Sequence, residues 1–354
     1  MTINSIASRL KAFLLAFSLT ISPCYAAENK LDRAAETFES QRAKGFTGYV
    51  IIVHEGKIVF SQGAGIADAQ SATPFAETTQ FDIASISKTI TGLLVAEEIT
   101  QGRIKPDSRL DMFFDIANMP LGEITIQQLL THTAGLVDVV GEDSEAISLQ
   151  NVVKRAAQTP LLYEPGTQYR YSNLGYSLLA AALEQHLGLS YEEIAMRRLA
   201  AVNAYSTGYA KVLDRAKSVR RADGRTICEM SWGGHPPGGN LIGNGGMIST
   251  PGDMARWLSA FSDGRLVSAE ARDLARTPYV DETGEGQSFY GYGLVVEEDD
   301  TLGTIFWHNG GSRQFNSHWR ELLDKDVIII ALSDQPPSQA DRMVLALQRA
   351  MFPD

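Results

Sequence analysis

Ser85 and Lys88 stand three residues apart where an apolar segment begins, and this spacing constrains both the fold and the chemistry of the chain. From Ile86 to Ile99 apolar residues recur at helical spacing, and Gly102 follows as a typical helix end. Residues three apart on a helix share one face, so the hydroxyl and the amine should meet. A serine in the first helical turn also lies among unpaired N–H groups that favour an oxyanion. The pattern predicts a nucleophile next to its proton acceptor.

Four further motifs follow this pair along the chain. They are residues 130–136 (LTHTAGL), 171–173 (YSN), 245–250 (GGMIST) and 308–311 (HNGG). In order and approximate spacing, the five motifs resemble the active-site elements of the serine β-lactamase and penicillin-binding-protein superfamily. The resemblance is to the branch of class C β-lactamases, D-alanyl-D-alanine carboxypeptidases, D-aminopeptidases and family VIII-type esterases, and it covers nearly the whole chain after the leader.

Hydrophobic patterning predicts a sheet built from both ends of the chain. Residues 30–44 suit an amphipathic helix, and 49–53 with 57–60 suit a hairpin that turns at Glu55-Gly56. Four more strands are expected at 291–297, 304–307, 317–322 and 327–332, with a last helix over about 338–351. Together with the resemblance, this predicts an α/β (α+β) β-lactamase-like fold. Its antiparallel sheet would be flanked by N- and C-terminal helices and interrupted by an inserted all-helical domain.

Three segments are expected from this organisation. Residues 1–26 would be a signal peptide, 27–104 and 238–354 a discontinuous sheet domain, and 105–237 the helical domain. In the helical part, Ser190 and Glu193 suit a capping box, and Gly188 suits the end of a helix that begins near Leu174. After it, Thr250-Pro251 suits the start of another helix.

The catalytic roles are assigned to three residues. Ser85 is the expected nucleophile, because its hydroxyl must lose a proton as it attacks a carbonyl. Lys88 is the nearest acceptor, since desolvation and nearby cations would lower its proton affinity. The resemblance implies that Tyr171 relays the proton to the leaving group and helps activate the deacylating water. The sequence leaves open whether Lys88 or Tyr171 is the principal base.

Four residues are expected to bind or orient the substrate. Asn173 should orient Lys88 or a substrate amide. His308 occupies the position that the resemblance gives as lysine in class C β-lactamases and histidine in several carboxypeptidases and esterases. Gly310 should allow close backbone approach, and the resemblance implies that the Gly311 N–H completes an oxyanion hole with that of Ser85.

Other residues near these motifs are expected to be structural. Asn309 stands where the resemblance implies a threonine or serine; it can still hydrogen-bond, but recognition of a substrate carboxylate is put in doubt. For His132 the preferred interpretation is a structural histidine that hydrogen-bonds the backbone at the start of the helical domain, and the alternative is a supporting role in catalysis. Four aromatic residues beside predicted strands are candidates either to line the cleft or to fill the core, and the core interpretation is preferred: Trp232, Trp307, Tyr290 and Tyr292. The histidines lack metal-ligand spacing, so neither a metal nor another cofactor is expected.

The N-terminus and the charge bear on location and partners. Arg9 and Lys11 precede the apolar run 12–21 and a small-residue site ending at Ala26, which predicts export to a periplasm or outside the cell after cleavage there. Lipidation at Cys24 is the minor alternative. Loss of Arg9 and Lys11 would change the net charge from −11 to −13, which disfavours nucleic-acid binding. No stable membrane span is expected, and the oligomeric state is left open.

Three functions follow from the motifs. The first is an exported serine hydrolase that acts through an acyl-enzyme on an ester or amide, with a D-amino-acid peptide from cell-wall material as one candidate. The second is a class C-like β-lactamase. The third is a penicillin-binding sensor or scaffold without turnover. In each case the partner is a small molecule or a peptide.

Overall fold

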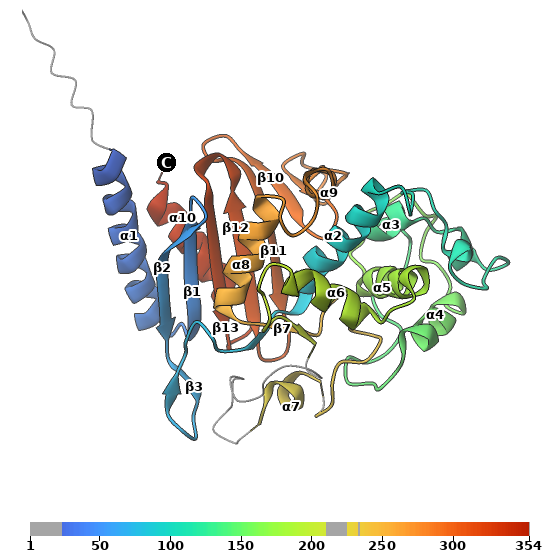
Figure 1. The fold of residues 1–354 in the computed structure, drawn as a ribbon, viewed down its shortest axis with the longest axis horizontal. Coiled ribbons are helices and arrows are strands. Elements are labelled where there is room, and N and C mark those ends of the chain that lie inside the picture. Colours follow the sequence, from blue (N-terminus) through green and yellow to red (C-terminus); the bar gives the residue numbers. More distant parts are fainter. Residues whose placement is uncertain (1–22, 210–224, 233, 354) are drawn as a thin grey trace, which may run out of the picture.

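An eight-stranded antiparallel sheet forms the centre of the computed structural model, which describes residues 23–209, 225–232 and 234–353. Its order is β2-β1-β13-β12-β11-β10-β9-β8, so strands from the two ends of the chain lie side by side (Figure 1). Their bounds are β1 (Gly48–His54), β2 (Lys57–Ala64), β8 (Val280–Asp281), β9 (Ser288–Tyr290), β10 (Val295–Asp299), β11 (Gly303–Gly311), β12 (Asn316–Leu322) and β13 (Val327–Ser333). The predicted α/β fold with an antiparallel sheet is confirmed.

The helices lie on both faces of the sheet and at one end of it (Figure 1). They are α1 (Pro23–Ala43), α2 (Ser87–Thr100), α3 (Ile126–Leu130), α4 (Leu149–Ala157), α5 (Asn173–Leu187), α6 (Tyr191–Ala200), α7 (Ile227–Ser231), α8 (Pro251–Ser262), α9 (Ala269–Ala275) and α10 (Gln339–Met351). A small second sheet has the order β5 (Phe81–Asp82), β7 (Met247–Ser249), β6 (Gly208–Tyr209). A two-stranded sheet pairs β3 (Ile66–Asp68) with β4 (Thr73–Pro74).

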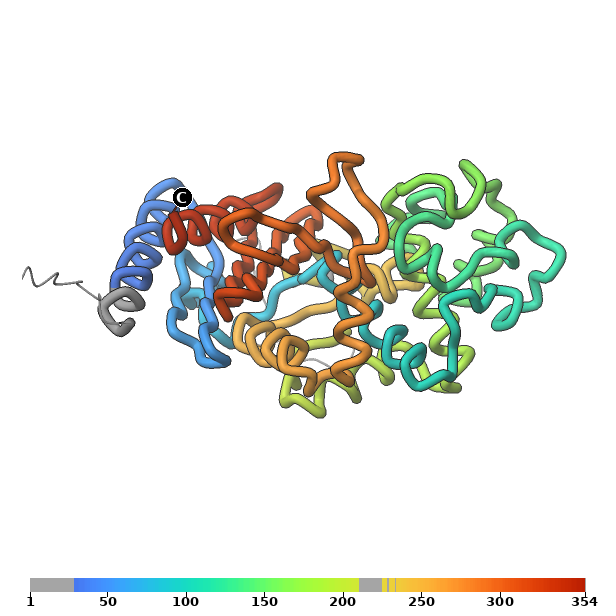
Figure 2. Tube along the Cα trace, turned by 90° about the horizontal axis from the view of Figure 1, so that it is seen from above, coloured from blue at the N-terminus to red at the C-terminus, as the bar shows by residue number. Residues whose placement is uncertain are grey.

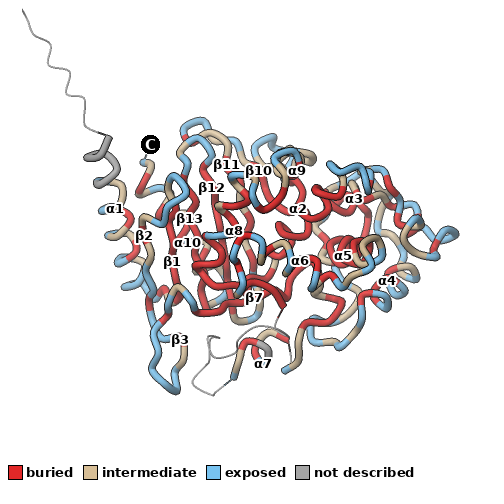
Figure 3. Tube along the Cα trace, in the orientation of Figure 1, coloured by how far each residue is buried: buried red, intermediate tan, exposed pale blue. Residues whose placement is uncertain are grey.

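Alternation along the strands creates two separate cores. On β1, Val50 and Ile52 belong to the cluster that α1 and α10 cover, whereas Ile51 and Val53 belong to the larger cluster with α2, α5 and α8. Figure 2 shows α1 and α10 next to each other over one face. The central strands and much of α2 and α5 are buried (Figure 3). Both faces are covered, and the active-site motifs lie on the side of the larger cluster.

Local signals in the sequence agree with the observed ends of the elements. The β1–β2 hairpin turns at Glu55 and Gly56, with φ of 49° and 69°. Ser190 begins α6 with a capping box, and Gly188 ends α5 in the left-handed conformation with φ 67°. Thr250 caps α8 through its side chain. These predictions are confirmed. The sequence could make them because each depends on contacts within a few residues.

The expected strand at 291–297 is wrong in its first half, since β10 begins at Val295. Residues 291–294 instead pack against α2. A Cβ on Gly293, where φ is 78°, would lie 2.2 Å from the Lys88 carbonyl oxygen. A Cβ on Gly92 would lie 2.1 Å from the Tyr292 carbonyl oxygen. The pattern could not reveal this, because the segment is shaped by a helix distant in sequence.

The division into a sheet domain and a helical domain stays a prediction. The signal peptide and its cleavage after Ala26 also stay predictions. Residues 1–22 of the expected signal peptide lie outside the described residues. Among the helices that the structure describes, none has the length and apolar character needed to cross a membrane.

The contact between α2 and residues 291–294 can be tested by adding one methyl group at Gly92. In a free helix Gly92→Ala would be stabilising by about 1 kcal/mol. Here we expect it to destabilise the protein by about 2 kcal/mol or more, because the Cβ meets rigid backbone. Urea unfolding measures the difference. Gly102→Ala is the control: its Cβ meets open space, so only the φ of 70° opposes it. A Gly92→Ala variant more stable than wild type would contradict the contact.

Candidate active site

Ser85 lies in a single 3₁₀ turn, η1 (Ala84–Ile86), that connects β5 to α2. Ala84 has φ 45°, a left-handed conformation that alanine rarely adopts unless surrounding contacts stabilise it. Its N–H donates to Asp82 Oδ1 at 2.9 Å, and its carbonyl accepts from Ser87 Oγ at 2.7 Å. Hydrogen bonds on both sides of the turn therefore hold the serine in place.

The Lys88 amine is fully buried against Ser85 and donates three hydrogen bonds. Its Nζ lies 3.1 Å from Ser85 Oγ, 2.7 Å from Asn173 Oδ1 and 2.8 Å from the Asn244 carbonyl oxygen. Desolvation lowers the pKa of Lys88 to about 7, opposed by Asp138. The expectation that nearby cations lower it is wrong. The charged groups that act on it are carboxylates, and burial alone outweighs them.

Tyr171 lines the second cavity beside the nucleophile together with Ser85, whose side chain acts to lower the pKa of the phenol. The Lys88 Nζ lies 4.8 Å from the centre of the Tyr171 ring. Desolvation raises the pKa of Tyr171, so the phenol holds its proton at neutral pH. Between the two candidate bases, the Lys88 amine is the one that can accept a proton near pH 7.

Asn173 is placed by the start of α5. Its backbone N–H donates to Asp138 Oδ1 at 2.9 Å, while Ser172 caps the helix. The side-chain oxygen of Asn173 can then reach Lys88. Asp138 and Asn244 were not expected at the site from the sequence. Asp138 lies in no motif, and Asn244 acts through its backbone, although its place just before the 245–250 motif was a usable signal.

His308 lies within β11 rather than at its end, and it is buried. Its Nδ1 lies 2.6 Å from the Asn309 carbonyl oxygen, which can only accept, so Nδ1 carries the proton. Its Nε2 then accepts from the Tyr290 hydroxyl at 3.1 Å. Burial and the Lys88 charge lower the pKa of His308 to about 3. This histidine is neutral, and the adjacent Asn309 amide is held by Asp341 of α10 at 3.2 Å.

Gly310, the first of the two glycines after Asn309, brings β11 against the nucleophile turn. A Cβ on Gly310 would lie 2.3 Å from the Ile83 carbonyl oxygen and 3.0 Å from the Ser85 nitrogen, so only glycine fits. Ser317 of β12 also donates to the Ile83 carbonyl, at 2.9 Å. Gly311 is exposed at the strand end. Its role in an oxyanion hole stays a prediction.

His132 hydrogen-bonds the backbone as expected, since its Nδ1 accepts from the Ser172 N–H at 3.1 Å. Its ring also packs 4.3 Å from the Tyr171 ring and 4.5 Å from the Tyr290 ring, measured between centroids. Burial and the Lys88 charge lower the pKa of His132, which keeps the ring neutral. The residue thus supports the wall behind Tyr171.

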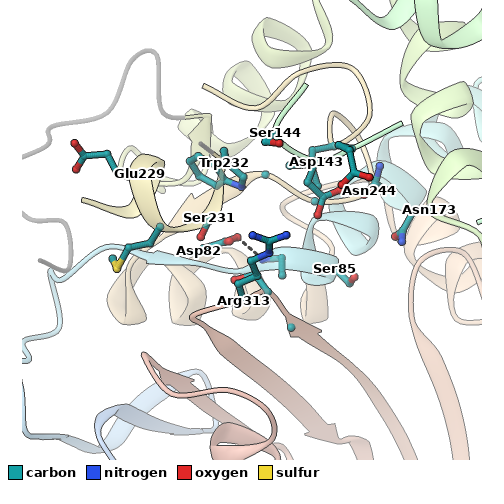
Figure 4. A pocket seen from close by; sticks show the side chains of 18 residues that line it. Asp82, Ser85, Asp143, Ser144, Asn173, Glu229, Ser231, Trp232, Asn244 and Arg313 are labelled. Atoms are coloured by element: carbon teal, nitrogen blue, oxygen red, sulfur yellow. Dashed lines mark hydrogen bonds between the residues drawn. The ribbon is translucent and has the colours of Figure 1, made fainter. Parts of the chain in front are cut away.

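Two cavities meet at Ser85, of about 300 and 330 Å³. Carboxylates line the first one: Asp82, Glu142, Asp143 and Glu229. In Figure 4, Ser85 and Asn173 lie at one end of this cavity and Glu229 at the other. The second is lined by aromatic rings and Glu282. These cavities are also lined by three aromatic residues for which the sequence favoured a place in the core: Trp232, Tyr290 and Trp307. Strand patterning cannot tell a buried ring that lines a cavity from one that only fills the core.

Within the described residues no group of His, Cys, Asp or Glu could hold a metal ion.

The comparison with known proteins agrees with this geometry. The Beta-lactamase family model matches residues 33–350. The chain belongs to the Beta-lactamase family. Penicillin-binding protein 4* of Bacillus subtilis (strain 168) is 26% identical over 337 residues, which cover 87% of this chain and 72% of that protein. Esterase EstB of Burkholderia gladioli is 26% identical over 314 residues, which cover 75% of this chain and 80% of that protein.

A solved structure of the same fold is the penicillin binding protein from Bacillus halodurans. It superposes with a TM-score of 0.76 at 23% identity and covers 90% of this chain and 99% of that one. The predicted membership of the serine β-lactamase and penicillin-binding-protein superfamily is confirmed, and the protein is a serine hydrolase of this family.

The buried amine predicts a pH profile. A base role for Lys88 predicts that the rate of acylation rises with pH through about 7 and levels off above it. Asp138→Asn should move this midpoint to lower pH, because the Asp138 charge raises the pKa of Lys88. The burst rate with p-nitrophenyl acetate measures both. The asparagine keeps an oxygen for the Asn173 N–H, and an unmoved midpoint would assign the titration to another group.

Proposed function

We propose that Ser85 attacks the carbonyl of an ester or amide and forms an acyl-enzyme that water then hydrolyses. The observation that carries this is the Ser85 Oγ–Lys88 Nζ contact of 3.1 Å, with the amine buried and its pKa lowered to about 7. Such an amine can take the hydroxyl proton at the moment of attack. The expected relay and oxyanion groups are Tyr171 and the N–H groups of Ser85 and Gly311.

The proposed reaction has two halves, acylation of Ser85 and deacylation by water, and a proton is transferred in each. As the Ser85 oxygen bonds to the carbonyl carbon, its proton passes to Lys88. The bond to the leaving group breaks, and that group receives a proton through Tyr171, which Lys88 replenishes. In deacylation the same residues take a proton from water and return one to Ser85. The phenol acts as a donor and relay, which suits its raised pKa.

The substrate is proposed as an ester or an amide of small size, with a D-amino-acid peptide as a candidate. Both an esterase and a penicillin-binding protein among the relatives support this range. If the leader directs export, cell-wall material would be accessible. The two cavities at Ser85 can receive the acyl part and the leaving group.

The test is intact-mass spectrometry with a fluorophosphonate and, separately, a penicillin. We expect one adduct with the fluorophosphonate, mapped to Ser85 and absent in Ser85→Ala.

A second experiment compares the turnover of three substrates: nitrocefin, a p-nitrophenyl ester and a D-alanyl-D-alanine peptide. The ester or the peptide should be preferred. Preference for nitrocefin would favour the β-lactamase. A penicillin adduct that persists without turnover of any substrate would favour the sensor, and no adduct from either reagent would refute the nucleophile.

Ser85 and Lys88 should act as one unit. We expect Ser85→Ala and Lys88→Ala each to lower kcat by about 1000-fold or more, and the double variant to lose little beyond either one. The reason is that both residues serve the same proton transfer. Steady-state kinetics on the preferred ester measures this, with thermal melting as the control for folding. Losses that multiply would show that the two residues act in separate steps.

A further inference from the structure

Asn316 begins β12 directly opposite the end of β11 that reaches the nucleophile. It pairs with Gly311 at the last position of the β11–β12 register. The residue is buried and lies in none of the five sequence motifs. Its side chain contacts both the strand end beside Ser85 and the start of α10. Asn316 therefore connects the active-site strand to a helix on the other face of the sheet.

The Asn316 amide makes four hydrogen bonds, which use all of its donors and both lone pairs. Its Oδ1 accepts from the backbone N–H groups of Ala340 and Asp341, at 2.7 and 3.2 Å. Its Nδ2 donates to the Gly310 carbonyl oxygen at 3.1 Å and to Asp341 Oδ2 at 3.2 Å. Backbone N–H groups can only donate and a carbonyl can only accept, so only one orientation of the amide satisfies these partners. The helix thus fixes an N–H donor against Gly310.

The Gly310 carbonyl and the Gly311 N–H belong to the same peptide unit. A peptide unit is planar and trans, so its C=O and N–H point in opposite directions. Since the Gly310 oxygen accepts from Asn316 of β12, the Gly311 N–H points away from β12. On that side the pairing of β10 with β11 ends at Trp307, and Gly311 lines both cavities at Ser85. The N–H is therefore directed toward the space beside the nucleophile.

A second side chain of β12 lies near the same carbonyl but is engaged elsewhere. Ser317 Oγ lies 3.4 Å from the Gly310 oxygen and 2.9 Å from the Ile83 carbonyl oxygen, so its single proton goes mainly to Ile83. Asn316 is the closer side-chain donor to Gly310. A hydrogen bond to the oxygen of an amide also polarises its N–H, which makes that N–H a stronger donor. The Asn316 contact thus both directs and strengthens the Gly311 N–H.

We propose that Asn316 positions the oxyanion hole: by hydrogen-bonding the Gly310 carbonyl, it aims the Gly311 N–H at the oxygen of the carbonyl that Ser85 attacks. Asn316 acts through this peptide unit and is a positioning residue rather than a catalytic one. The proposal rests on the proposed acyl-enzyme chemistry at Ser85. It deepens that proposal by naming the group that holds one of its two expected oxyanion donors.

The test is Asn316→Ala with two substrates that differ in one atom, 4-nitrophenyl acetate and its thionoester, in which sulfur replaces the carbonyl oxygen. Sulfur is a weak hydrogen-bond acceptor, so an oxyanion hole favours the ester. We expect the ratio of kcat/KM values, ester to thionoester, to fall about tenfold in the variant. This is less than the roughly 100-fold that loss of an oxyanion donor costs, because the Gly311 N–H stays but is aimed less well. Structural damage alone would slow both substrates equally and leave the ratio unchanged.

Asp341→Ala is the matched control. It removes the carboxylate that accepts from Asn309, Asn316 and His318, so the melting temperature should fall. The Asn316 bond to Gly310 stays, as do the backbone N–H groups that hold its oxygen, so the ester ratio should remain that of wild type. If Asn316→Ala fails to fold, Asn316→Asp replaces it. This variant keeps an oxygen toward α10 but has no N–H, and the ratio should fall in the same direction.

The NMR signal of the Gly311 amide proton tests the direction of this N–H without turnover. The phosphoryl oxygen of a fluorophosphonate adduct on Ser85 stands in for the oxyanion. In wild type the signal should move downfield on labelling, and it should move less in Asn316→Ala.

Three results would overturn the proposal: an unmoved Gly311 signal in labelled wild type, an unchanged ester ratio in Asn316→Ala, or an equal fall of that ratio in Asp341→Ala. Absence of a fluorophosphonate adduct would instead refute the Ser85 chemistry on which the proposal rests.

Discussion

The burial of one amine organises the active site. Lys88 is fully buried and reaches Ser85, Asn173 and the Asn244 carbonyl at 2.7–3.1 Å. These partners come from three separate parts of the chain, so the amine is desolvated only when α2, α5 and the segment before β7 are assembled. Desolvation lowers its pKa to about 7 against the pull of nearby carboxylates. Folding therefore produces an amine that can accept a proton near neutral pH.

The charges around the nucleophile are unevenly distributed. One cavity is lined by carboxylates with Arg313, and the other by aromatic rings, Glu282 and a neutral histidine. His308 is neutral because its two nitrogens are engaged and burial opposes the proton. Burial, which opposes the proton on His308, also lowers the pKa of Lys88, so its amine can accept a proton near neutral pH.

Close backbone contacts place the sheet directly against the turn that carries the nucleophile. Gly310 lies against Ile83 and the Ser85 nitrogen, while Gly293 lies against the Lys88 carbonyl, each with no space for a Cβ. Glycine in the HNGG motif was expected from the sequence to allow such an approach. The role of Gly293 was not, because patterning assigned residues 291–297 to one strand. A helix packed across the chain bends the first half of this segment away from the sheet.

The sequence by itself determined the local elements and the spacing that brings Ser85 and Lys88 together. The capping box at Ser190, the hairpin at Glu55-Gly56 and the one-turn spacing of Ser85 and Lys88 depend on neighbours within four residues. The tertiary structure decided the state of those groups: Asp138 beside Asn173, the Asn244 carbonyl on Lys88, and Tyr290 on His308. Proton affinity depends on solvent exclusion and on charges brought together from distant segments, and no local pattern encodes these.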